Sequence, residues 1–64
     1  MAKYIQLEAT VGTLWVNVDH VVSVVPLIDK ETRAPILGRS EVLIAFLGPV
    51  TINQDPGDIV ALLA

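Results

Sequence analysis

The chain has 64 residues, 53% of them hydrophobic, with no cysteine, one histidine and a net charge of −3. This length allows one domain, 1–64, which buries only about 60% of its unfolded surface and is marginally stable alone. The absence of cysteine excludes disulfides, thiolate zinc sites and thiol catalysis, and the negative charge argues against a protein specialised for nucleic acid phosphates. Oligomerisation is therefore the expected source of additional stability.

The first two segments alternate between apolar and polar residues, as half-buried strands do. In Tyr4–Ala9 the apolar residues occupy every second position, and in 13–18 they do so again, with Trp15 on the outer set. Gly12 ends the short connection between the segments and supplies the positive φ of a tight turn. The pattern predicts an antiparallel hairpin.

Two further segments are apolar on both faces. The first, 21–26, contains four valines, whose β-branching favours a strand, with Val22 and Val24 on one face and Val21 and Val25 on the other. A fourth strand is predicted at 41–47, followed by a turn at 48–49 and a fifth strand at 50–53.

Two-sided apolar strands leave one face of a single sheet without a partner. We expect that face to form a subunit interface. Alternatively, the C-terminal helix covers it, or the sheet curls until both sets are internal. The expected interface residues are Trp15, Val21, Val25 and Phe46.

The connection 27–40 is the longest polar segment and forms either a loose loop or the tip of a long hairpin. It contains three of the four basic residues and, between Pro35 and Gly38, an apolar pair. Long loops commonly carry binding functions, so we expect a partner or ligand contact in the 29–40 loop. The alternatives are a solvated loop and an apolar pair that folds back onto the core. The candidate contact residues are Lys30, Arg33, Ile36, Leu37 and Arg39.

The C-terminal segment 55–63 predicts a helix of about two turns. Asp55 is suited to cap it, Pro56 to the first helical position, and Asp58 to the positive end of the helix dipole. Its apolar face is predicted to consist of Ile59, Leu62 and Leu63.

The element order β-β-β-β-β-α predicts a mainly β fold. We expect an antiparallel meander of about five short strands, as a twisted sheet or small half-barrel, with a short C-terminal α-helix.

No residue pattern in the chain predicts catalysis. His20 follows Asp19 in a turn, where neighbouring side chains diverge, and Asp55 and Asp58 are explained by capping. The chain has no phosphate-binding glycine loop, no nucleophile elbow and no spacing of metal ligands. We therefore expect no enzyme activity, no cofactor and no metal.

Three segments, Leu14–Val24, Leu47–Ile52 and Asp55–Leu63, together resemble small bacterial and phage β-rich proteins of the FlbD/SwrD-like pattern found in flagellar operons. The shared features are a strand ending in Val-Asn-x-Asp, a strand rich in valine and isoleucine, a glycine-turn hairpin and a closing helix. The resemblance omits the 29–40 loop and transfers no site residues. It implies a compact, non-enzymatic domain with a regulatory or interaction role, and the small size is compatible with a phage or mobile-element origin.

The expected function is that of a self-associating protein-interaction or regulatory module, a homo-oligomer with a further protein partner of unknown identity. The alternative is a ligand- or nucleic-acid-binding module that uses the basic residues of the 29–40 loop. No apolar stretch reaches the roughly 18–20 residues of a membrane span, and polar residues interrupt the N-terminal apolar run, so we expect a soluble, cytoplasmic protein without a membrane partner.

Overall fold

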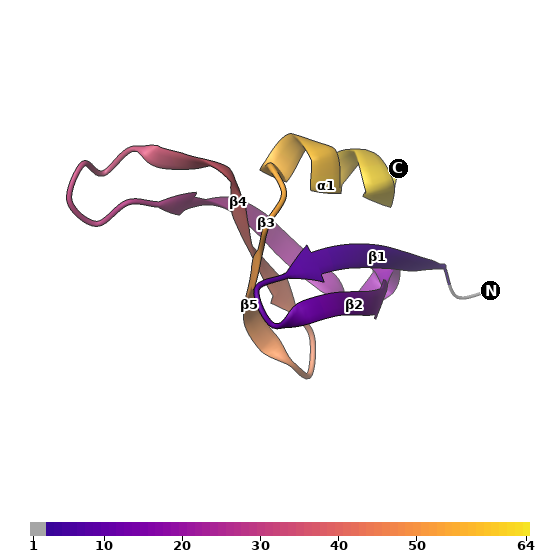
Figure 1. Cartoon of the computed structure of the whole chain (residues 1–64). Helices are drawn as coiled ribbons and strands as arrows, with labels where there is room; N and C mark the ends of the chain where they lie inside the picture. The colour runs from indigo at the N-terminus through magenta and orange to yellow at the C-terminus, as the bar shows by residue number, and fades with distance from the viewer. Residues whose placement is uncertain (1–2) are drawn as a thin grey trace.

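The computed structural model describes residues 3–64, which form a single five-stranded sheet with one short helix (Figure 1). All strand pairs are antiparallel, in the order β2-β1-β5-β4-β3, which confirms the predicted mainly β fold class. Pairing of β1 with β5 joins the β1–β2 hairpin to a three-stranded unit, so β2 and β3 are the edge strands. The elements are β1 (Tyr4–Ala9), β2 (Gly12–Asn17), the 3-10 turn η1 (Val18–His20), β3 (Val21–Ile28), β4 (Pro35–Ile44), β5 (Gly48–Ile52) and α1 (Pro56–Leu63).

The β1–β2 hairpin forms as its alternation predicts. Ala9 pairs with Gly12 across a two-residue turn, and Gly12 has a φ of 131° that only glycine adopts readily. The apolar residues of β1 are buried and its polar residues are exposed. The hairpin therefore contributes one apolar face to the core.

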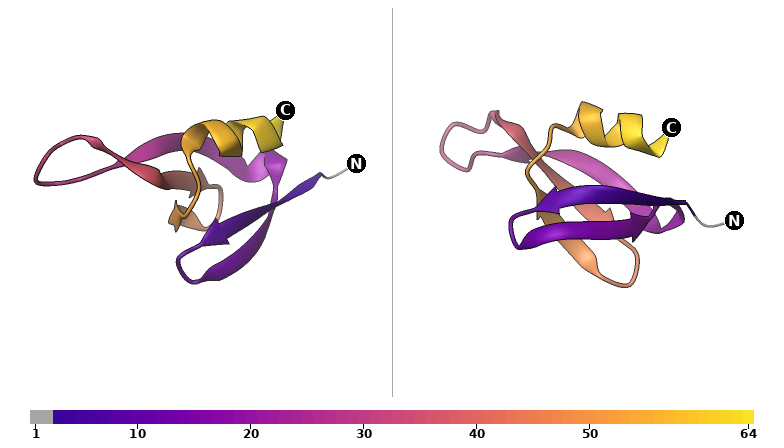
Figure 2. Two further views of the ribbon diagram at one scale, coloured as in Figure 1. Left: turned by 45° about the horizontal axis from the view of Figure 1, so that its top comes forward. Right: turned by 45° about the vertical axis from the view of Figure 1, so that its right-hand side comes forward.

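The 27–40 connection is the tip of a long hairpin and not a loose loop. Arg33 N–H donates to the Asp29 carbonyl (2.8 Å) and Asp29 N–H to the Ala34 carbonyl (3.0 Å), while the Asp29 carboxylate accepts from Glu31 N–H (2.8 Å). We call residues 27–39 the arm; it projects from the body and stretches the molecule to 42 × 22 × 20 Å (Figures 1 and 2).

The bounds of β4 and β5 correct the expected ones. β4 begins at Pro35 because the arm is paired, as Ile28 with Pro35 shows, and it ends at Ile44. The turn lies at 45–47, and Gly48–Pro49 opens β5 instead of forming the turn. Proline is tolerated there because β1 joins β5 only at Ile52, which leaves the far side of β5 unpaired at Pro49.

An irregularity in β3 changes which of its valines face the core. The register shifts between Val21 and Ser23, which places Val22 in a bulge with 63% of its surface exposed. Val21 and Val24 consequently both pack against the core, so the assignment of Val22 with Val24 to one face is wrong.

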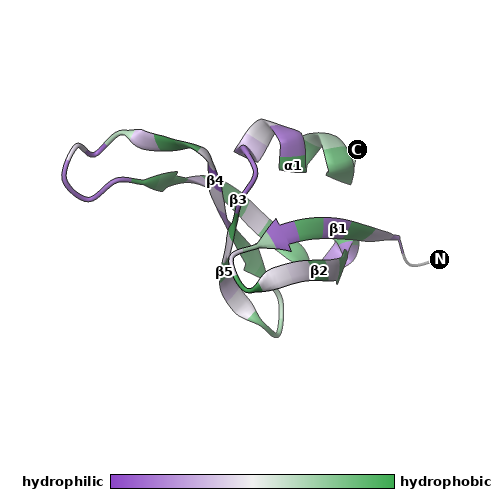
Figure 3. Cartoon of the chain, in the orientation of Figure 1, coloured by the Kyte–Doolittle hydropathy of each residue, from purple (hydrophilic) through white to green (hydrophobic). Residues whose placement is uncertain are grey.

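The core is small and lies between the curled sheet and α1, which packs against β1 and β3 (Figure 3). Ile59 of α1 is fully buried and Leu63 is half-buried, whereas Leu62 is 39% exposed. The contacting face of the helix is therefore narrower than predicted. Among residues 3–64, eight apolar side chains are buried: Ile5, Leu7, Ala9, Val16, Val42, Ile44, Ile52 and Ile59.

The segment 53–55, here called the junction, ties β5 to three other elements. Asn53 N–H donates to the Glu8 carbonyl (2.7 Å), and the Gln54 side-chain oxygen accepts from Glu8 N–H (3.1 Å). The fully buried Ser40 hydroxyl donates to the Gln54 carbonyl (2.5 Å). These bonds attach β1 and β4 to the start of the helix.

Asp55 does not cap α1 with its side chain. Its carboxylate instead accepts a 2.6 Å hydrogen bond from Gly38 N–H, at the base of the arm. The expected capping role is therefore wrong: the side chain faces β4 and fastens the arm to the helix start.

Replacing Ile59 with alanine should lower the free energy of unfolding by about 2–4 kcal/mol, because it leaves a cavity beneath the helix. Leu62→Ala on the same helix is the matched control and should cost under about 1 kcal/mol, since Leu62 is partly exposed. Denaturant unfolding measures both. Equal losses would mean that the helix does not dock through Ile59.

Ser40→Ala should cost about 1–3 kcal/mol, because the partly buried Gln54 carbonyl loses its donor. The exposed Ser23 of β3 provides the control, and Ser23→Ala should change stability by less than about 0.5 kcal/mol. Thermal and denaturant unfolding of the two variants decide the point. A neutral Ser40→Ala would show that the junction does not depend on this bond.

Candidate functional site

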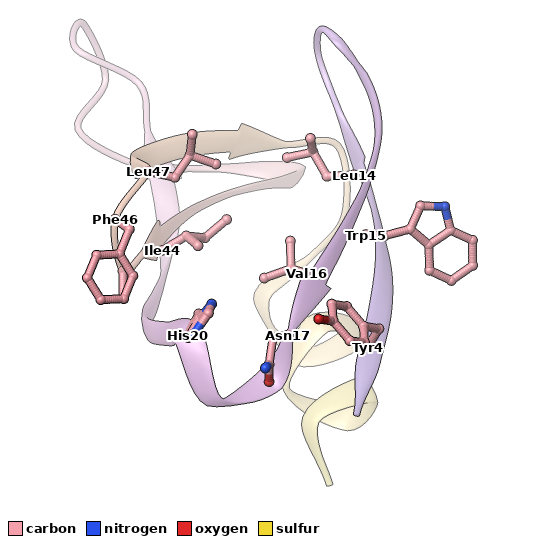
Figure 4. A pocket seen from close by; sticks show the side chains of 10 residues that line it. Tyr4, Leu14, Trp15, Val16, Asn17, His20, Ile44, Phe46 and Leu47 are labelled. Carbon is pink, nitrogen blue, oxygen red and sulfur yellow. The ribbon is translucent and has the colours of Figure 1, made fainter. Parts of the chain in front are cut away.

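An open pocket of about 260 Å³ lies between β2 and the 45–47 turn (Figure 4). Val16 and Ile44 in its lining are buried core residues, and Leu14 is half-buried. No Lys, Arg, Asp or Glu lines this pocket of the described chain. The lining residues are Tyr4, Leu14, Trp15, Val16, Asn17, His20, Ile44, Ala45, Phe46 and Leu47.

The edge position of β2 explains why residues from both of its faces reach the pocket. Leu14 and Val16 belong to the inner set, while Trp15 belongs to the outer set and lies opposite Gln6 of β1. Figure 4 shows His20 pointing into the pocket and the indole of Trp15 turned away from the other lining side chains. Trp15 is 67% exposed, so its ring is open to solvent at the pocket rim.

The turn at 45–47 holds Phe46 in an unusual backbone conformation. Leu47 N–H donates to the Ile44 carbonyl (3.1 Å), and Phe46 has a φ of 70° at the third turn position, where glycine is normally required. A bulky side chain in this region costs about 1–2 kcal/mol. Phe46 is nevertheless 99% exposed, so burial in its own subunit does not compensate for the strain.

His20 lies beside the turn and supports it. Its carbonyl accepts a 2.7 Å hydrogen bond from Ala45 N–H, and its ring meets that of Phe46 edge to face, with centroids 5.6 Å apart. His20 is the last residue of η1, which the Asn17 side chain caps by accepting a 2.9 Å hydrogen bond from Asp19 N–H. The role that geometry gives His20 is to position the turn.

The structure brings together two of the four residues expected at a subunit interface. Trp15 and Phe46 line the same pocket. Val25 lies on β3 with 45% exposure, outside the pocket lining, and Val21 packs against the core of its own subunit. Leu47, which was not among the expected interface residues, joins the rim because β4 ends at Ile44, three residues earlier than expected.

The arm carries the five candidate contact residues of the 29–40 loop, and none of them lines the pocket. Lys30 and Arg33 lie in the tip, which also contains Asp29 and Glu31, so the tip has no net positive charge. In the apolar pair Ile36 is half-buried and Leu37 is 90% exposed, while Arg39 is exposed nearer the body. Of the apolar pair, only Leu37 is therefore presented to solvent.

Comparison with protein-family models, curated proteins and solved structures gave no significant match. In the described range 3–64, no helix is long and apolar enough to cross a membrane. The same residues contain no cluster of three or more His, Asp or Glu side chains suited to a metal ion.

Proposed function

We propose that this chain is a non-enzymatic β domain that self-associates and acts as a protein-interaction or regulatory module. The observation that carries the proposal is the exposed apolar rim of the pocket. We call the four rim residues Tyr4, Trp15, Phe46 and Leu47 the aromatic patch; they are 59%, 67%, 99% and 62% exposed, respectively. Exposed apolar residues gathered around a cavity are typical of interfaces.

The patch is large enough to contribute substantially to a dimer. Fully covered aromatic side chains bury about 150–250 Å² each, so the exposed parts of its three aromatic residues amount to roughly 450 Å². A stable interface buries about 800 Å² on each partner. Leu47 adds to the aromatic area, whereas the Trp15 indole is turned away from the other lining side chains, so one flat contact covers part of this area.

A second copy of the chain is the partner that the charges favour. Each subunit carries a net charge of −3, and self-association brings equal charges together unless the contact surface is neutral. The pocket lining is free of charged Lys, Arg, Asp and Glu side chains, as such a contact requires. A nucleic acid or an acidic membrane would instead be recognised by cations, which the lining lacks.

The strained conformation of Phe46 also supports a contact role. Within one subunit the ring is 99% exposed and its backbone is held at a φ suited to glycine. The 45–47 turn imposes this φ and His20 meets the ring at its edge, but the ring remains uncovered. Strained residues are often found at functional surfaces. A second subunit that covers the ring would provide the missing stabilisation.

The alternative, a ligand- or nucleic-acid-binding module that uses Lys30, Arg33 and Arg39, has weaker support. Two acidic residues share the tip with Lys30 and Arg33. Arg39 lies apart, near the base of the arm, so the three cations do not form one patch around a common site.

Light scattering on the wild-type chain tests the proposal directly. The expected mass is a multiple of the 6.9 kDa subunit at micromolar concentration. A monodisperse monomer under these conditions would refute self-association.

Phe46→Gly should weaken self-association at least tenfold, the equivalent of 1.4 kcal/mol, while leaving the subunit folded. Relief of the positive φ offsets the greater entropy of unfolded glycine, so the subunit should not be destabilised. Arg33→Gly is the matched control, because Arg33 also has a positive φ (58°) but lies in the arm.

Sedimentation gives the dissociation constant of each variant, and circular dichroism shows whether its subunit is folded. Equal association of the wild type and both glycine variants would remove Phe46 from the interface.

A further inference from the structure

The two edges of the sheet differ in how well they are protected from pairing. β3 contains Pro26 and two register irregularities, which are devices that prevent edge-to-edge contact. β2, Gly-Thr-Leu-Trp-Val-Asn, has no proline, no charged residue and a continuous register with β1. The β2 edge is therefore open to another strand, and it borders the aromatic patch.

The register identifies the β2 residues whose main-chain groups point outward. Val18 N–H donates to the Lys3 carbonyl (2.9 Å), which makes this pair a hydrogen-bonded one. Because bonded and non-bonded pairs alternate in an antiparallel ladder, β2 residues 16, 14 and 12 also bond to β1. The residues at 13, 15 and 17 direct their N–H and C=O groups away from β1, and β2 pairs with no other strand among residues 3–64. The Asn17 carbonyl is the exception to an open edge, because Asn17 is the N-cap of η1 and its carbonyl accepts the first bond of that turn.

We propose that a second copy of the chain pairs with this edge, β2 against β2 in antiparallel orientation, with Trp15 on the twofold axis. This inference rests on the proposed self-association and specifies how it occurs. The outward groups are centred on residue 15, so in this register Trp15 pairs with Trp15 of the second copy, and Thr13 pairs with Asn17, whose carbonyl η1 shares. The two sheets then form one continuous sheet of ten strands.

The same register matches side chains on both faces. On the outer face the two Trp15 indoles lie side by side, which is a favourable cross-strand aromatic pair, flanked by polar Thr13 and Asn17. On the inner face Leu14 lies opposite Val16 of the second copy, beside the pocket that Phe46 and Leu47 border. No charged side chain lies on either strand, so the contact joins no like charges.

Proline at position 13 tests the edge without disturbing the β1–β2 ladder. Thr13→Pro removes an N–H that points to solvent in the free subunit, where edge strands tolerate proline. Thr13→Ala is the matched control, because it removes the same hydroxyl, which donates to the Glu8 carboxylate (3.0 Å), but keeps the N–H. We expect Thr13→Pro to be a folded monomer and Thr13→Ala to associate as the wild type does.

A single cysteine provides a second test that does not depend on proline. The chain has no cysteine, so Trp15→Cys introduces the only thiol. Bonded antiparallel pairs have Cα atoms about 5.5 Å apart, within the range of a disulfide. Under mild oxidation Trp15→Cys should form a covalent dimer rapidly. Val25→Cys, exposed on the protected edge strand, is the control and should not.

These outcomes separate the two proposals. A wild-type chain that scatters as a monomer overturns both self-association and edge pairing. An oligomeric wild type whose Thr13→Pro variant still associates, or whose Trp15→Cys variant crosslinks no faster than Val25→Cys, overturns edge pairing alone. If Thr13→Pro fails to fold, the crosslinking comparison decides.

Discussion

The two halves of the sheet pair with each other at one narrow place, where β1 meets β5, and α1 bridges them by packing against β1 and β3. The sheet ladder there has a single paired position, Ala9 with Ile52, and the junction extends it through the bonds of Asn53 and Gln54 to Glu8. This connection sets the angle between the β1–β2 hairpin and the three-stranded unit. Together with the hydrogen bond from Ala45 N–H to the His20 carbonyl, it sets the separation of β2 from the 45–47 turn, and with it the pocket (Figure 4).

The small core limits the stability of a single subunit. Eight apolar side chains are buried in the described chain, whereas twelve large hydrophobic residues are exposed. Covered apolar surface contributes about 25 cal/mol per Å², and a domain of this size has little stability to spare. Association through the aromatic patch would add burial where a single subunit lacks it. The small number of buried side chains in one subunit thus connects the fold with the proposed self-association.

Sequence patterns predicted the strands that have one polar face, because alternation of apolar and polar residues depends on local chemistry. They also located the helix, because Pro56 and Asp58 are residue types that favour its first turn. They failed for β3, since a bulge at Val22 reverses the faces without a sequence signal. They misplaced the turn beside Phe46, since Gly48–Pro49 is a turn signature that β5 absorbs through its unpaired side. The pocket was not predictable, because it depends on the β1–β5 contact between distant segments. Trp15 and Phe46 were selected from their apolar surroundings alone.

Contact with a second copy is proposed to raise the free energy of unfolding of this subunit. Thermal unfolding of the wild-type chain over a wide range of concentration tests it most directly, because association of folded subunits makes Tm depend on concentration. The account predicts a Tm that rises steadily with chain concentration. A folded chain whose Tm is the same at every concentration would contradict it.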